Sequence, residues 1–279
     1  MSWQNPSGFI RLPAHAIRGI ATDPADSWRR VVDKLAERLE WRKEPCLYVA
    51  DPDWEKRLHA LLEITWPCAA CASFHELWPV VVQEMLALGL QAGPESFGPW
   101  NDGDMGLTRA IWCLIHHLRP NRVVETGVAH GFTSRFILEA LKRNQIGQLW
   151  SIDLPPISGD LQRQVGIAVP EHLRQRWTYI RGSSRRRLPR LLRELKQIDL
   201  FVHDSLHSER NVRFEMNQAV RTLTSKGAIV VDDVDANWGF HSFAQSVPEY
   251  DTIVCEAEPT RPDLRRFNNK GLFGIALKR

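Results

Sequence analysis

The hydrophobic positions change their spacing partway along the chain. In the first hundred residues they recur at helical spacing, which predicts helices over residues 27–39, 54–64 and 74–90, the last interrupted at Pro79. After a further helix at 107–118, short apolar runs alternate with helical stretches. These runs cover residues 123–124, 149–152, 177–180, 200–202 and 228–231. Runs of this kind separated by helices are typical of a parallel sheet built from βαβ units.

Two further apolar runs, at 252–255 and 272–277, are joined by a polar loop without helical spacing. They predict an antiparallel hairpin at the end of the chain. The expected fold is therefore α/β: a doubly wound, mostly parallel, seven-stranded Rossmann-like sheet with an antiparallel C-terminal hairpin. Residues 1–95 are expected to form a mainly helical N-terminal extension, and residues 96–279 the sheet domain.

The first apolar run leads into Glu125 and a turn of small residues, Gly127, Ala129 and Gly131, ahead of an amphipathic helix. Such a turn brings backbone N–H groups and a helix N-terminus close to a ligand, and small side chains leave room for it. The spacing differs from the G-x-G-x-x-G dinucleotide fingerprint, because the glycines are four apart and Glu125 occupies the first position. A carboxylate there would repel a pyrophosphate, so it favours a cationic or hydroxyl-bearing ligand.

Four of the five parallel strands are expected to end in carboxylates. These are Glu125, Asp153, Asp204, and the pair Asp232 and Asp233. Ligands of such sheets bind outside the carboxyl ends of the strands, so the acids should share one crevice. Clustered carboxylates raise each other's pKa unless a cation lies among them, and a sulfonium or a divalent metal would serve. Asp153 has the spacing of a ribose acceptor, a role common to nicotinamide and S-adenosylmethionine sites.

The segment Asp204-Ser-Leu-His207 adds a candidate base to the acids. Three carboxylates on neighbouring strand ends, from Asp204, Asp232 and Asp233, suit magnesium, which takes oxygen ligands. His207 is expected one turn into the next helix, where it could deprotonate a metal-bound hydroxyl or simply hydrogen-bond to Asp204. Ser183, after a glycine, is a candidate for the adenine edge or a solvated loop residue.

Residues 95–250 resemble the class I methyltransferases allied to macrocin-type, or macrolide-sugar, O-methyltransferases. The stretches that carry this resemblance are VVETGVAHGFTS, LWSIDLPP, RWTYIRGSS, IDLFVHDSLHSERNVRFEM and GAIVVDDVDAN. The resemblance implies that S-adenosylmethionine is held by Glu125, Gly127, Gly131 and Asp153. We add Ala129, Thr133, Ser134, Ser183 and Asp204 as cofactor-binding candidates. The resemblance further implies that magnesium is held by Asp204, Asp232 and Asp233, and that His207 acts as base beside Asp204.

The expected function is metal-assisted O-methylation of a small-molecule hydroxyl, as in a sugar or a natural product. Two alternatives stay open: a nicotinamide-dependent oxidoreductase on a similar sheet, and a non-catalytic S-adenosylmethionine-binding or interaction module. The region before residue 95 has no motif that identifies an acceptor. Trp100 and Asn101, just before the sheet domain, are the aromatic and amide residues best placed to cover the cofactor.

Composition narrows the partners and the compartment. A net charge of +3, from 36 basic and 33 acidic residues, is too balanced to indicate nucleic acid. The most apolar segment, 77–90, is too short for a membrane span, and no signal peptide is expected at the start. Five cysteines without a framework fit a reducing cytoplasm, and a homo-oligomer is compatible with the sequence. Cys68-Ala-Ala-Cys71 with His75 has zinc-like or redox-like spacing, but no second pair follows, which favours packed thiols.

Overall fold

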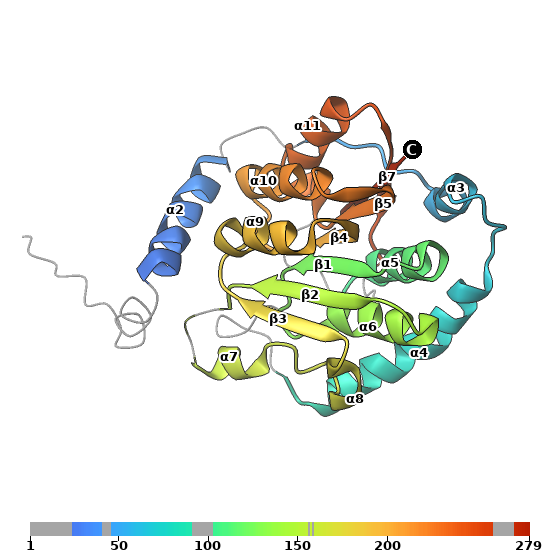
Figure 1. Cartoon of the computed structure of the whole chain (residues 1–279), viewed down its shortest axis with the longest axis horizontal. Coiled ribbons are helices and arrows are strands. Elements are labelled where there is room, and N and C mark those ends of the chain that lie inside the picture. Colours follow the sequence, from blue (N-terminus) through green and yellow to red (C-terminus); the bar gives the residue numbers. More distant parts are fainter. Residues whose placement is uncertain (1–23, 41–45, 91–102, 156, 158, 259–270) are drawn as a thin grey trace, which may run out of the picture.

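The structure is a computed structural model, and it describes residues 24–40, 46–90, 103–155, 157, 159–258 and 271–279. Its centre is a seven-stranded sheet with the order β3-β2-β1-β4-β5-β7-β6 (Figure 1). The strands are β1 (Arg122–Thr126), β2 (Gln148–Asp153), β3 (Trp177–Arg181), β4 (Ile198–His203), β5 (Leu223–Val231), β6 (Tyr250–Glu256) and β7 (Leu272–Lys278). Strands β1 to β5 are parallel, whereas β7 pairs antiparallel with both β5 and β6. The predicted fold class, including the terminal hairpin, is confirmed.

Helices cover both faces of the sheet. They are α2 (Pro24–Glu40), α3 (Trp54–Leu61), α4 (Ala69–Ala87), α5 (Met105–Leu118), α6 (Phe132–Asn144), α7 (Gly159–Gln164), α8 (Glu171–Arg174), α9 (Ser184–Leu195), α10 (Glu209–Val220) and α11 (Gly239–Ser246), with a 3-10 helix η2 (Val234–Ala236). One core lies between the sheet and α4, α5 and α6, and the other between the sheet and α9, α10 and α11. Successive strand residues alternate between the two cores, as Val123 and Val124 do, because side chains alternate across a strand.

Helix α4 differs from the expectation of an interruption at Pro79. It runs unbroken from Ala69 to Ala87 with Pro79 inside it. Proline removes one intrahelical hydrogen bond. The buried side chains on either side, Trp78 and Val81, belong to the core. Burying two such side chains contributes about 3–6 kcal/mol, which offsets a proline cost of about 3 kcal/mol.

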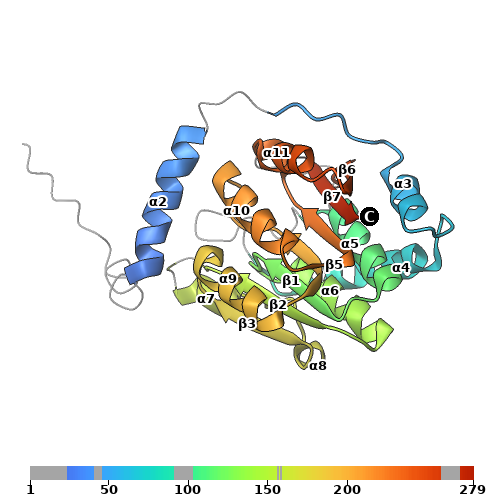
Figure 2. The same cartoon turned by 45° about the horizontal axis from the view of Figure 1, so that its top comes forward.

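The N-terminal extension is not a uniform appendage. Helix α4 completes a core of the sheet domain, because the Trp78 ring lies 5.2 Å from the Phe132 ring and 5.3 Å from the Phe136 ring of α6. Helix α2 instead lies at the side toward which the arrows of β1 to β3 point, away from α3 and α4 (Figure 1; Figure 2). The expected domain boundary at residue 95, like Trp100 and Asn101, falls outside the described residues. Within those residues, no helix combines the length and apolarity that a membrane crossing requires.

Candidate active site

The turn after β1 is held against the end of β4. Gly127 has a φ of +89°, and a Cβ there would lie 1.8 Å from the carbonyl oxygen of Asp204. Gly131 has a φ of +81°, and a Cβ there would lie 2.8 Å from the Cα of Gly166. Both glycines are therefore required by neighbouring backbone. The sequence interpretation assigned them to the approach of a ligand, and the structure gives this different reason for their size.

Glu125 lies beneath the turn and is fully buried. Its Oε2 accepts hydrogen bonds from the hydroxyls of Ser134 and Ser151, each at 2.6 Å. Its Oε1 is buried and has no hydrogen-bond partner among the described residues. Burial raises the pKa of Glu125 to about 7, against the lowering effect of the two serines. Ser134 thus supports Glu125, and Thr133 is partly buried beside it in the first turn of α6.

Asp153 ends β2 next to the same turn. Its carboxylate accepts hydrogen bonds from the backbone N–H groups of Leu154 and Ala129, and Ala129 has a φ of +46°. The Oδ2 atom of Asp153 is buried and makes no hydrogen bond to any described residue. Burial raises the pKa of this carboxyl to about 6. One oxygen is therefore available for hydroxyl donors of a ligand, because a buried acceptor without a partner is costly.

A second group of candidates gathers at the ends of β4 and β5. One ligand atom from each of Asp204, His207 and Asp232 lies within 4.8 Å of the others; we call these three residues the acid–histidine cluster. His207 Nε2 lies 3.8 Å from Asp204 Oδ1, and His207 Nδ1 lies 2.8 Å from Asp233 Oδ2. Asp233, predicted as a metal ligand, thus contacts the imidazole. His207 precedes α10 instead of lying one turn into it, because Ser208 caps that helix by accepting from the N–H of Asn211 at 3.3 Å.

The electrostatics of this cluster favour a cation or a proton. Burial raises the pKa of Asp204, and the charges of Glu125 and Asp233 raise it further. Burial also raises the pKa of Asp232 well above its usual value, and the negative charges of Asp233 and Asp204 raise it further. The side chains of Asp204 and His207 are 31% and 18% exposed, so the cluster remains open to solvent and to a ligand.

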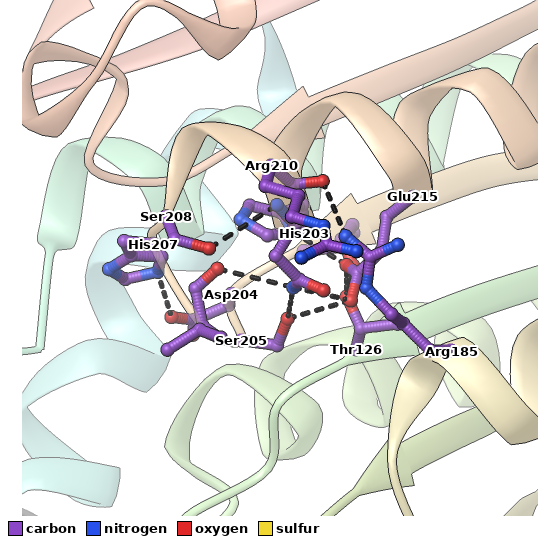
Figure 3. Close-up of polar contacts among 12 residues, drawn as sticks. Thr126, Arg185, His203, Asp204, Ser205, His207, Ser208, Arg210 and Glu215 are labelled. Carbon is purple, nitrogen blue, oxygen red and sulfur yellow. Dashed lines mark hydrogen bonds and ion pairs between the residues drawn. The ribbon is translucent and has the colours of Figure 1, made fainter. Parts of the chain in front are cut away.

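A buried network fixes the end of β4, and sequence reasoning missed its central residue, Glu215 of α10 (Figure 3). His203 Nδ1 lies 2.6 Å from Glu215 Oε2, and the hydroxyl of Thr126 donates to the same oxygen at 2.5 Å. Ser205 and Asn211 donate to Glu215 Oε1, both at 2.9 Å. Burial would raise the pKa of Glu215, but His203 and the hydrogen bonds from Ser184 and Thr126 lower it to about 2. Glu215 has no sequence signal, since it appears as an ordinary helical glutamate.

The loop after β5 holds His207 from the other side, through a residue that sequence reasoning also missed. The side chain of Asn237 donates to the backbone carbonyl of His207 at 3.0 Å and accepts from the N–H of Gly239 at 2.7 Å. An asparagine followed by Trp-Gly would be read from sequence only as a turn. The position of His207 is therefore determined by two strand ends rather than by one helix.

Helix α2 lies across this edge of the sheet (Figure 2). Asp26 accepts a hydrogen bond from the Ser183 hydroxyl at 2.7 Å, so the predicted adenine-edge residue has a protein partner. At the other end of α2, Glu40 accepts from the backbone N–H groups of Glu209 and Arg210, at 2.7 and 3.3 Å. The helix therefore joins the N-termini of α9 and α10. Its apolar side chains Trp28, Val31, Leu35 and Leu39 are exposed.

Comparisons with known proteins agree with this fold. Residues 124–234 match the family model described as a methyltransferase domain. An O-methyltransferase from Bacillus cereus in complex with SAH has 11% identity and a TM-score of 0.52, over 79% of this chain and 96% of its own. The O-methyltransferase TomG from Streptomyces achromogenes, solved with SAM, has 15% identity and a TM-score of 0.52, over 81% of this chain and 96% of its own. No curated protein sequence matches. Residues 124–234 are therefore similar to a methyltransferase domain, and the chain has the fold of these O-methyltransferases.

Proposed function

We propose that the chain is an S-adenosylmethionine-dependent O-methyltransferase that acts on a hydroxyl of a small molecule. One observation carries this proposal: a cofactor-type turn and an acid–histidine cluster meet at the same edge of the sheet, and Gly127 packs directly on the backbone of Asp204. A methyl donor held at the first and an acceptor held at the second would be adjacent. Orientation of this kind is the largest contribution that a protein can make to such a displacement.

Two buried carboxylate oxygens without hydrogen-bond partners among the described residues support the cofactor roles. Asp153 Oδ2 is buried and unsatisfied within the described residues, as expected for an acceptor of ribose hydroxyls. Glu125 Oε1 is in the same condition beneath the turn, and a sulfonium compound would bring positive charge to this region. S-adenosylmethionine supplies an activated methyl group when bound. Nicotinamide dinucleotides bring a pyrophosphate to the turn instead, which the Glu125 carboxylate would repel.

His207 is the proposed base. Its Nδ1 faces Asp233, an arrangement that fits an Nδ1–H donating to the carboxylate and leaves Nε2 toward Asp204. His207 would take the proton of the acceptor hydroxyl as the acceptor oxygen forms its bond to the methyl carbon. The carbon–sulfur bond of the bound methyl donor would break as the new bond forms, which would leave a neutral thioether. Asp204 would orient the acceptor at the end of β4.

A divalent metal fits the donor set of the acid–histidine cluster. Two carboxylates and an imidazole lie close enough to share one ion, and their raised carboxyl pKa values indicate a site short of positive charge. Magnesium prefers oxygen ligands, so Asp204 and Asp232 would hold the ion and Nε2 of His207 would keep the role of base. When bound, such an ion lowers the pKa of a coordinated hydroxyl. The metal assistance, the acceptor class, a cytoplasmic location and a homo-oligomer stay proposals from the sequence.

Calorimetry with S-adenosylmethionine, S-adenosylhomocysteine and NAD, each with and without magnesium, tests the proposed function. We expect binding of the two adenosyl sulfur compounds and none of NAD. Asp153→Asn should weaken S-adenosylhomocysteine by about 1.5–3 kcal/mol, or roughly 10- to 150-fold, because a charged acceptor is lost. The matched control is Asp160→Asn, which changes an exposed acid of α7 that forms an ion pair with Arg163. Binding of NAD in place of the sulfonium would overturn the proposal, and unchanged affinity in Asp153→Asn would remove Asp153 from the site.

A further inference from the structure

Three helices bring together a set of metal-type ligands that lies apart from the proposed active site. One ligand atom from each of His59, Cys68, Cys71 and Cys113 lies within 4.8 Å of the others; we call these four residues the cysteine–histidine cluster. Cys68 Sγ lies 3.5 Å from Cys71 Sγ, and Cys71 Sγ lies 3.3 Å from Cys113 Sγ. His59 Nε2 lies 3.1 Å from Cys68 Sγ. The four residues come from α3, from the start of α4 and from the middle of α5.

The surroundings of these side chains favour thiolates that face an ion. Cys68 is the N-cap of α4, and its carbonyl oxygen accepts from the N–H of Cys71 at 3.1 Å, so the helix dipole stabilises negative charge at this helix start. His59 Nδ1 lies 2.7 Å from the carbonyl oxygen of Glu55, which fixes the ring so that Nε2 faces the sulfurs. Metal-binding histidines are commonly held in this way by the nitrogen that does not bind the metal. His117 Nε2 adds a contact of 3.3 Å to Cys68 Sγ.

We propose that His59, Cys68, Cys71 and Cys113 bind one zinc ion as a structural site. Three cysteines and one histidine, with two of the cysteines in a Cys-x-x-Cys pair, are a ligand set of structural zinc. A tetrahedral ion about 2.3 Å from each sulfur requires sulfur atoms about 3.8 Å apart. The sulfur–sulfur distances of 3.5 and 3.3 Å would each have to lengthen by only a few tenths of an ångström. Four protein ligands leave no position for a substrate. This proposal is independent of the proposed function.

The position of the cluster supports a structural role. His117, in the last turn of α5, contacts Cys68, and β1 begins a few residues later at Arg122. The cluster therefore lies near the amino end of β1. The proposed active site lies at the opposite, carboxyl ends of the strands. His59, Cys71 and Cys113 are buried, and Cys68 is half-buried. A zinc ion here would attach α3 and α4 to α5, and thereby join the N-terminal helices to the methyltransferase domain.

The first test is the metal content of the full-length protein, purified with zinc in the medium and measured by mass spectrometry under reducing conditions. We expect about one zinc per chain, as for one closed site. Cys113→Ser and His59→Ala should lose it. Cys255→Ser, a matched control in β6 outside the cluster, should retain it, and so should Asp232→Asn, which removes a carboxylate of the acid–histidine cluster.

A second measurement keeps the proposal falsifiable if a cysteine variant fails to fold. Cobalt added to the metal-free, reduced protein should give the intense visible bands of tetrahedral thiolate coordination. His59→Cys should keep the metal and shift these bands, because it converts three sulfurs to four. Structural zinc sites bind the ion tightly enough to remain occupied during purification. Wild-type protein with less than about 0.1 zinc per chain and no cobalt bands would overturn the proposal. So would zinc that is lost in Asp232→Asn but retained in Cys113→Ser.

Discussion

The two clusters at opposite ends of the strands differ in chemistry and in enclosure. The acid–histidine cluster combines two carboxylates with an imidazole, and its side chains are reached by solvent. The cysteine–histidine cluster combines three sulfurs with an imidazole, and most of it is buried. Open sites with hard donors leave coordination positions for a substrate, whereas closed sites with soft donors hold an ion permanently. One edge of the sheet is therefore suited to chemistry and the other to stability.

The comparison also shows how each cluster is assembled. At the carboxyl edge, the parallel sheet brings Asp204 and Asp232 together, since β4 and β5 are neighbours and pair through His203 and Val231. At the amino edge, packing of α3, α4 and α5 assembles the ligands without any help from the strands. Changes at the two edges should therefore have separable effects, and three variants can test this.

The largest expected effect is on catalysis. His207→Gln should lower kcat/KM by about 10²- to 10⁴-fold, because the proposed base is lost while a side chain of similar size remains. Affinity for S-adenosylhomocysteine, measured by calorimetry, should stay within about twofold, since His207 faces the acceptor side. The control His172→Gln replaces an exposed histidine of α8 and should leave both quantities unchanged. Unchanged kcat/KM in His207→Gln would exclude His207 as the base.

The second effect is on stability. Removing zinc from the cysteine–histidine cluster should lower the free energy of unfolding by about 3–4 kcal/mol when free zinc would otherwise exceed its Kd by about 100- to 1,000-fold. For a protein of this size the melting temperature should fall by roughly 6–16 °C. Calorimetric melting of Cys71→Ser and of wild-type protein with a strong chelator measures this. Asp232→Asn should melt without such a loss, and equal losses in both variants would remove the distinction between the clusters.

The smallest effect concerns pH. The pKa of Glu125 rises from 4.5 to about 7 on folding, so its contribution to stability is fully present below pH 4.5 and is lost as pH rises to 7. This shift corresponds to about 3 kcal/mol as an upper figure. Glu125→Gln can keep the hydrogen bonds from Ser134 and Ser151, and it should remove this part of the pH dependence. Denaturant titrations of the ligand-free protein between pH 4.5 and 7 measure the slope.

Glu171→Gln, a change of an exposed acid in α8, is the control for that titration. Its slope should match that of the wild-type protein. Identical slopes for Glu125→Gln and the wild-type protein would show that Glu125 does not gain a proton on folding in this pH range.

The sequence predicted the strands and the residues whose positions depend on the strand ends. The alternation of apolar runs and helices gave all seven strands, and the carboxylates Asp153, Asp204 and Asp232 lie where strand ends should place them. Parallel strands carry their carboxyl ends to one edge, so a residue's place in the strand indicates its place in space. Whether these residues bind a cofactor or a metal stays a prediction.

The sequence could not predict groupings made by helix packing. Cys113 is 42 residues from Cys71 and lies in a helix whose pattern indicates only burial. His59 and Cys68 come from different helices, so the Cys-x-x-Cys pair appeared to lack further ligands. Glu215 and the Asp26–Ser183 contact were missed for the same reason, because each joins segments whose relative positions only the folded chain defines.

The close contact between Gly127 and the carbonyl of Asp204 has a consequence for engineering. The turn after β1 and the end of β4 touch without any side chain between them, so these two segments should move together. Substitutions meant to widen the acceptor range of the proposed enzyme should therefore avoid Gly127 and the backbone at Asp204. A side chain as small as alanine at position 127 would meet the carbonyl oxygen of Asp204 and spread the ends of β1 and β4, and under the proposed function it would misalign the methyl donor for every acceptor at once.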